Sequence, residues 1–317
     1  MQSQSHNFRS RSIAALADSR LQAALAKARG GFVDKRRAAI DALPEFEALR
    51  AQGQAIREHV LDHLDRYLDQ YATKVEEIGG QVHWAETAAD ARRIIAELCA
   101  AAGAKRVTKG KSMVGEEVGL NEALEARGME VVETDLGEYI IQLAKEPPSH
   151  IVAPAVHKNR AQVEALFRQH HRQEDIARDL SRIPDLVDEA RRILREKFLS
   201  ADVGITGANF LVAETGGNII VTNEGNGDLT ANLPKTHIVI AGIEKVVPTL
   251  DEAATLLRLL GRSATGQAIT SYVTHHAGPR RPGDKDGPSA YHVVLVDNGR
   301  SRMLAGRYRD MLRCIRC

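Results

Sequence analysis

Cysteine is scarce in this sequence. Only Cys99, Cys314 and Cys317 occur among 317 residues, too few for the disulfide frameworks that hold small secreted domains together. The N-terminal segment MQSQSHNFRSRS also lacks the apolar run of a secretory signal peptide. A reducing cytoplasm is therefore the expected location.

Long apolar runs and an excess of one charge are also missing. No run approaches the roughly 18 residues that a membrane span needs, so no span is expected. The 43 basic and 42 acidic residues give a net charge of +1, so no overall field favours nucleic acid. Aromatic residues make up only 4%, which indicates a core packed from aliphatic side chains.

Residues 13–77 have a helical pattern. Apolar residues recur at steps of three and four, namely Ile56, Val60, Leu64, Leu68 and Tyr71. Gly30, Gly31 and Pro44 are expected to divide the segment into two or three helices. We interpret residues 1–78 as a helical N-terminal extension that packs on the main domain or on a partner.

From residue 79 on, short apolar runs alternate with helical stretches. We expect strands at 81–84, 106–108, 130–133 and 151–153, and helices at 87–101 and 112–127. Such alternation is typical of parallel βαβ units. Residues 159–198 are predicted to form a solvated helical insertion that restarts at Pro184.

After residue 202 the pattern becomes strand-rich. The turn residues in ETGGN predict a hairpin between two β-branched runs. A mobile hairpin connection is expected in HHAGPRRPGDKDGPSAY. The sequence therefore predicts an α/β fold with added C-terminal strands.

The stretch TKGKS follows a predicted strand and opens a predicted helix, where backbone amides attract anions. It is not a P-loop, because the first glycine of that motif would fall on Lys105. Lys111 and Ser112 remain candidates for binding a carboxylate or phosphate. Ser112 could equally be only a helix cap.

Carboxylates gather where the predicted strand at 130–133 ends. Glu133 and Asp135 are followed by Glu138, at the edge of the sheet where α/β proteins bind ligands. Such a group can act as acid or base or bind a cation. For Asp135, helix capping is the simpler explanation.

The densest polar stretch is ITGANFLVAETGGNIIVTNEGNGDLT. Polar groups among buried strands need partners, and a ligand can be one of them. The candidates are Asn209, Glu214, Asn218, Asn223, Glu224, Asn226 and Asp228. Glu214 lies in an apolar run, so it should be paired, protonated or functional. No third glycine follows GNG, which excludes a dinucleotide fingerprint.

The remaining reactive residues are dispersed. Neither histidine pair, 170–171 or 275–276, forms a metal site by itself, because adjacent side chains usually point apart. Cys99 lies on an apolar helix face and is expected in the core. An arginine-rich segment then leads to C-x-x-C, formed by Cys314 and Cys317.

Several long motifs resemble one family. GITGANFLVAETGGNIIVTNEGNGDLTANLPKTHIVIAGIEKVVP, KSMVGEEVGL, ETDLGEYIIQL and MLRCIRC are similar to the lactate utilization protein B family, over nearly the whole chain. That family is the iron–sulfur subunit of a three-component bacterial L-lactate oxidation system and contains a LUD domain. The resemblance implies a NagB/RpiA/CoA-transferase-like fold.

The resemblance also explains the terminal C-x-x-C. In the family it continues into a ferredoxin-like module that binds [4Fe–4S] clusters, so Cys314 and Cys317 would be cluster ligands only in a longer chain. A cubane needs four thiolates, and this chain is expected to hold no cofactor. The implied partners are a cysteine-rich subunit and a second LUD protein.

These observations give a domain plan and a site. We expect a helical extension at 1–78, a LUD α/β domain at 79–305 and the start of a missing cluster module at 306–317. Lys111 and Ser112 would hold a small carboxylate, with Glu133, Glu214 and the 223–228 loop near it.

Two other classes of function stay open. A CoA-transferase or sugar-phosphate isomerase would use Glu214 or Glu224 as nucleophile or base. A docking scaffold would have no substrate site. Fold alone does not decide among them.

Overall fold

The fold is built on two sheets. The computed structural model describes residues 5–314. The six strands of the central sheet are all parallel, in the order β1-β10-β7-β4-β2-β3. They span Gln81–Ala85, Ala290–Val296, Thr236–Gly242, Val203–Thr206, Arg106–Lys109 and Glu130–Glu133.

A second, four-stranded sheet has the order β8-β5-β6-β9. Its strands are Val246–Val247, Phe210–Val212, Gly217–Thr222 and Tyr272–His276. β5 and β6 form an antiparallel hairpin, and β9 pairs with β6 on its far side.

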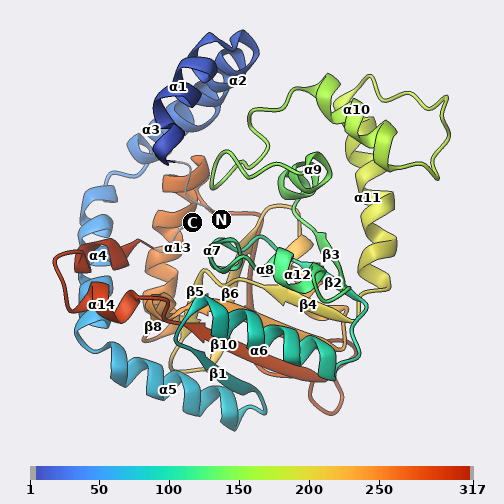
Figure 1. The fold of residues 1–317 in the computed structure, drawn as a ribbon. Helices are drawn as coiled ribbons and strands as arrows, with labels where there is room; N and C mark the ends of the chain where they lie inside the picture. The colour runs from blue at the N-terminus through green and yellow to red at the C-terminus, as the bar shows by residue number, and fades with distance from the viewer. Residues whose placement is uncertain (1–4, 315–317) are drawn as a thin grey trace.

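Helices surround both sheets (Figure 1). The first five, α1 to α5, are Phe8–Ala17, Ser19–Arg29, Lys35–Asp41, Phe46–Asp62 and Leu64–Glu77. The next four, α6 to α9, are Ala88–Ala101, Met113–Val118, Leu120–Glu125 and Leu136–Ala144. The last five, α10 to α14, are Arg160–His170, Ile183–Leu199, Asn226–Asn232, Leu250–Thr265 and Arg300–Leu304.

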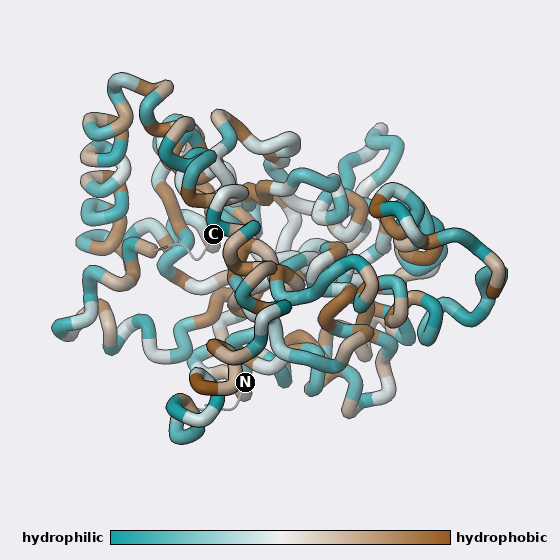
Figure 2. Tube along the Cα trace, turned by 90° about the horizontal axis from the view of Figure 1, so that it is seen from above, coloured by the Kyte–Doolittle hydropathy of each residue, from teal (hydrophilic) through white to brown (hydrophobic). Residues whose placement is uncertain are grey.

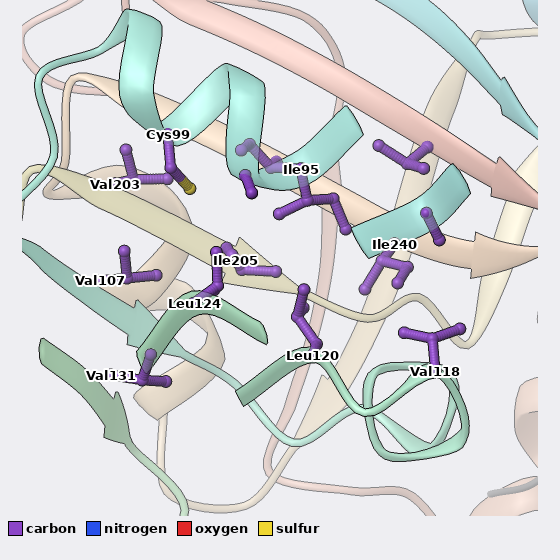
Figure 3. Close-up of a cluster of buried hydrophobic side chains, with 14 of the residues drawn as sticks. Ile95, Cys99, Val107, Val118, Leu120, Leu124, Val131, Val203, Ile205 and Ile240 are labelled. Carbon is purple, nitrogen blue, oxygen red and sulfur yellow. The ribbon is translucent and has the colours of Figure 1, made fainter. Parts of the chain in front are cut away.

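One face of the central sheet is covered by α6, α7 and α8. Strand residues such as Ile205 and Ile240 point to this face and pack in one cluster with Ile95, Leu120 and Leu124 (Figure 3). Cys99 is fully buried in the same cluster, as predicted, and burial raises the pKa of its thiol to about 12. It is therefore a core residue with no nucleophilic thiolate at neutral pH.

The opposite face is covered by α5 and the second sheet. Val239 and Ala241 of β7 pack there against Tyr71 and Leu211. The outer face of the second sheet is covered in turn by α4 and α13, through residues such as Phe210 and Leu256. Both faces of the central sheet are thus buried, as is usual for parallel sheets.

Two groups of helices extend from this core (Figure 1). α9, α10 and α11 share a cluster of their own that includes Phe167 and Val132. α1, α2 and α3 contain no buried residue. Seen from above, hydrophilic and hydrophobic residues alternate along the coiled segments of the trace (Figure 2).

Much of the predicted architecture is confirmed. The structure is α/β with a parallel sheet, and strands form at three of the four predicted early positions. The ETGGN turn does connect an antiparallel hairpin, β5–β6. The five apolar residues chosen from the helical pattern, Ile56 to Tyr71, are all buried.

Other predictions were wrong. Residues 151–153 form no strand, because the amides of Val152 and Ala153 bond to the His150 ring and Pro154 follows. The predicted helix at 112–127 is two helices, broken at Gly119, whose φ of 67° is left-handed. Residues 277–289 are no hairpin connection, since β9 and β10 belong to different sheets.

The helical regions also differ from prediction. Among the described residues, five α-helices, not two or three, precede the first strand, and Gly30 begins a π-helical turn instead of a break. Pro184 does lie in the first turn of α11. However, the 159–198 segment is not merely solvated, because α10 and α11 bury apolar side chains.

Among the helices of residues 5–314, none is both long enough and apolar enough to cross a bilayer.

We predict that Gly204→Ala destabilises the protein by at least about 1–3 kcal/mol, the usual cost of overpacking. A Cβ at this position of β4 would lie 1.8 Å from the Thr230 carbonyl oxygen of α12. Urea unfolding measures the change. Gly31→Ala is the matched control, since its Cβ meets nothing within 4 Å. Equal stability of the two variants would contradict the close β4–α12 contact.

Candidate functional site

The principal cavity opens at the carboxyl end of the central sheet. Its volume is about 230 Å³, below the roughly 300–1,000 Å³ typical of sites for drug-sized ligands. Its walls come from the segments that follow β2, β4 and β6. In parallel α/β sheets this edge is where ligands bind.

Two lysines line the cavity. Lys111 follows β2, and its ammonium donates to the Val152 carbonyl, 2.9 Å away. Lys245 follows β7 and is 4% exposed. Asp135 and Glu224 line the same cavity and formally balance the two lysine charges, so the lysines offer donors for an anionic ligand and not an overall positive field.

Buried acceptors without partners also occur at the cavity. Among the residues that the structure describes, Asn226 Oδ1 and Thr222 Oγ1 have no hydrogen-bond partner, and both residues line the cavity. Buried polar atoms are almost always satisfied. A ligand or an ordered water in the cavity would supply the missing bonds.

Glu224 stands at the exposed rim of the same cavity. Partial withdrawal from solvent raises the pKa of its carboxyl group, the Asp135 carboxylate raises it further, and Lys111 opposes the change. A carboxyl group with a raised pKa beside an anion pocket can donate or accept a proton.

Several predicted residues line the cavity while holding its walls together. Ser112 is the N-cap of α7, where its hydroxyl accepts from the Gly115 amide at 3.0 Å. Asn209 accepts from the Val221 amide at 2.9 Å, which joins β5 to β6. Asn223 accepts from Ser271 and Gln267, which ties its loop to the segment after α13.

Glu214 is separated from this group. It lies in the β5–β6 turn and accepts from the Leu250 amide at 2.6 Å, at the start of α13. The cavity is at the opposite end of the hairpin, at Asn209. Five residues of strand span about 16 Å, so the predicted shared pocket of Glu214 and Lys111 is not formed.

Asn218 and Asp228 are also not among the residues that line the cavity. Asn218 is fully buried and accepts from the Tyr291 hydroxyl at 2.7 Å. Asp228 faces His276 and raises the pKa of that ring, although burial lowers it overall. The Asn218 carbonyl oxygen thus has a structural partner, whereas its amide nitrogen has none among the described residues.

Glu133 belongs to a separate cluster behind α7. It forms a 2.9 Å ion pair with Lys109, which is fully buried. Burial alone would lower the pKa of Lys109, but the carboxylates of Glu133, Glu138 and Glu116 outweigh burial and raise it. Burial and the neighbouring Glu133 raise the pKa of Glu138 to about 8. Glu138 therefore holds a proton more firmly than an ordinary glutamate.

A second cavity, also about 230 Å³, lies beside His237, His275 and His276. Burial lowers the pKa of all three rings, so they are uncharged near neutral pH. Arg280 and Arg281 also line this cavity, together with Asp284 and Asp286, so the histidines add no positive charge to a lining whose other charges cancel.

The C-terminal cysteines are only partly described. Cys314 is exposed and carries a free thiol. Cys317 lies outside the described residues.

Sequence reasoning missed part of the cavity wall. Lys245 and Thr206 line it, but each sits at the end of an apolar strand with no motif to mark it. Asp135 was predicted as a helix cap, which is confirmed by its bond to the Glu138 amide at 3.1 Å. It also lines the cavity.

We predict that Glu138→Gln gains stability over the parent protein as pH rises from about 4.5 to 8. The raised pKa of Glu138 means that the parent loses stability as its unfolded state releases this proton first. Below that window the two proteins should differ least. Thermal unfolding as a function of pH, with a chelator present, measures the gap. The exposed Glu97→Gln is the control; a gap that widened on acidification would contradict the assignment.

Comparisons with known proteins place these features in a family. The LUD domain family matches residues 68–296. Lactate utilization protein B of Bacillus velezensis is 49% identical over 284 residues, covering 89% of this chain and 59% of that protein. Lactate utilization protein B of Geobacillus is 46% identical over 314 residues, covering 98% and 65%. The chain thus spans about three fifths of the length of such relatives.

Two further similarities were found. An uncharacterized electron transport protein of Escherichia coli, YkgF, is 44% identical over 312 residues, covering 98% of this chain and 65% of that protein. A solved DUF162 family protein from Deinococcus radiodurans has a TM-score of 0.40 and 14% identity, covering 74% of this chain and 98% of that one. The resemblance noted in the motifs is confirmed, and the chain belongs to the LUD domain family.

Proposed function

We propose that this chain is the LUD portion of a subunit that serves L-lactate utilization, and that its lysine-lined cavity binds a small carboxylate such as lactate or pyruvate. Relatives named for lactate utilization support the pathway. The placement of Lys111 and Lys245 in one small cavity supports the ligand class. That pair of lysines is the observation on which the proposal depends.

The cavity has groups for both ends of a 2-hydroxy acid. The lysine ammonium groups would pair with the carboxylate. The unpartnered oxygens of Asn226 and Thr222 could accept from the hydroxyl group. Glu224, with its raised pKa, is placed at the rim to exchange a proton with solvent.

Oxidation of lactate to pyruvate releases two electrons and two protons, so an electron acceptor is required. The thiols of this chain do not fit a [4Fe–4S] cluster, because a cubane needs four thiolates and Cys99 is enclosed in the core. We propose that the clusters are carried by the portion of the relatives that this chain does not span and by partner subunits.

The proposed partners are a cysteine-rich subunit and a second LUD protein, and the proposed location is the cytoplasm. The free thiols of Cys99 and Cys314 are compatible with a reducing compartment.

A second candidate is a proton-transfer or acyl-transfer enzyme of the CoA-transferase or isomerase kind. Glu224 favours it, because a carboxyl group with a raised pKa beside a lysine-lined cavity could act as base or nucleophile. Glu214 does not favour this candidate, because it accepts from the first amide of α13 and lies away from the cavity. Turnover assays of the parent and of Glu224→Gln with acyl-CoA or sugar-phosphate substrates separate the candidates. Turnover by the parent that the substitution abolishes would favour the second candidate.

We predict that Lys111→Ala weakens L-lactate or pyruvate binding by on the order of 1–3 kcal/mol, the range for a charge-assisted hydrogen bond. Isothermal titration calorimetry measures it directly. Lys27→Ala, on the exposed face of α2, removes the same charge and should leave binding unchanged. Equal affinity of all three proteins, or no binding by the parent, would refute the carboxylate site.

We also predict that the purified chain alone reduces no dye with L-lactate, whereas the full-length subunit with its partners does. The reason is the shortage of thiolates for a cluster. Iron analysis after anaerobic reconstitution is the independent measurement, and it should find no stoichiometric iron. Lactate-dependent turnover by the isolated chain would show that it contains a redox centre of its own.

A further inference from the structure

A compact acidic cluster lies outside the lysine-lined cavity. Glu116 comes from α7, Glu133 from the end of β3 and Glu138 from the first turn of α9, with Lys109 at the end of β2. None of the four is among the residues that line either described cavity. We call these four residues the Lys109 cluster.

The three carboxylates are close enough to share one ion. One oxygen of each lies within 4.8 Å of the others. Points with that spacing all lie within about 2.8 Å of a common centre, which small side-chain shifts bring into the 2.3–2.6 Å range of Ca²⁺–oxygen bonds. The 2.0–2.1 Å bonds of Mg²⁺ would need a tighter arrangement.

Charge within the cluster is unbalanced. Lys109 is 2.9 Å from Glu133 and 3.3 Å from Glu116, so it supplies one positive charge against three carboxylates. With all three ionised the formal charge is −2, which is costly at a buried site. A divalent cation would bring the sum to zero and replace the proton that Glu138 otherwise holds.

Glu133 provides the second, independent observation. The residue is 3% exposed, and its Oε1 is taken by Lys109 and by the Asn121 amide at 2.6 Å. Its Oε2 is buried and has no partner among the described residues. A buried carboxylate oxygen without a donor lacks a cation or a proton, and Glu138, which is hydrogen-bonded to Glu133, is the group that holds a proton in the absence of an ion.

An ion could also reach the cluster. The Glu116 side chain is 24% exposed, whereas Glu133 and Glu138 are buried. The cluster is therefore open on the α7 side and closed on the β3 side.

We propose that the Lys109 cluster is a binding site for one hard divalent cation, Ca²⁺ by its spacing, held by Glu116, Glu133 and Glu138. The ion would join α7, β3 and α9. Because Asp135 at the start of α9 and Ser112 at the start of α7 line the lysine-lined cavity, it would also fix two sides of that cavity.

The test is calorimetric titration of the chelator-treated chain with Ca²⁺, with Mg²⁺ in a parallel titration. We expect one site per chain, tighter for Ca²⁺, and a higher Tm with the ion bound. Glu133→Gln and Glu138→Gln should each weaken Ca²⁺ binding at least tenfold. Glu97→Gln, which removes an exposed carboxylate of α6, should not.

Glu116→Gln covers the case in which a buried substitution prevents folding. Its side chain is the most exposed of the three, so the variant should fold and still bind Ca²⁺ at least tenfold more weakly. Absence of Ca²⁺ binding by the parent at millimolar concentration would overturn the proposal and leave Lys109 as the only cation. The proposal would also be overturned if Glu116→Gln bound Ca²⁺ as tightly as the parent does.

Discussion

Burial of the central sheet on both faces is the constraint on which the remaining structure depends. A parallel sheet needs two covering layers, and here one is helical while the other consists of α5 and the second sheet. Because the β5–β6 hairpin covers the central sheet, its open end lies beside the carboxyl ends of β2 and β4. The lysine-lined cavity is the space left between these three ends. Its position thus follows from how the layers cover one another.

The fold could be predicted wherever local patterns agree with tertiary packing. Strands 81–84, 106–108 and 130–133 and the ETGGN hairpin needed only apolar runs and turn residues. The errors arose where the structure is determined by contacts that the local sequence pattern does not reveal. Ile151 and Val152 are β-branched, but the amides of Val152 and Ala153 donate to the His150 ring. β9 and β10 look like hairpin partners but separate into two sheets, which no local pattern records. The NagB/RpiA/CoA-transferase-like type of the fold stays a prediction.

The candidate site was predicted in part. Lys111, Ser112, Asn209, Asn223, Glu224 and Asn226 do line one cavity, because each follows or ends a strand and the carboxyl ends of strands meet at one edge. Glu214 was misplaced because a carboxylate in an apolar run has several explanations, and here it is a helix cap. Lys245 and Lys109 were missed because a single lysine after an apolar strand is indistinguishable from a solvated one without knowledge of its neighbours.

The order of strands has a consequence for how the protein is made. β1 is an edge strand whose sole partner in the described sheet is β10, in a register that joins Gln81 to His292. A ribosome adding about 5–20 residues per second needs on the order of ten to forty seconds to synthesise the chain between them. During that interval β1 has left the ribosome but β10 has not yet been synthesised. The backbone groups of β1 can then pair with other nascent chains. Slowing elongation between residues 86 and 289 should therefore increase the demand for chaperones, whereas slowing it before residue 80 should not.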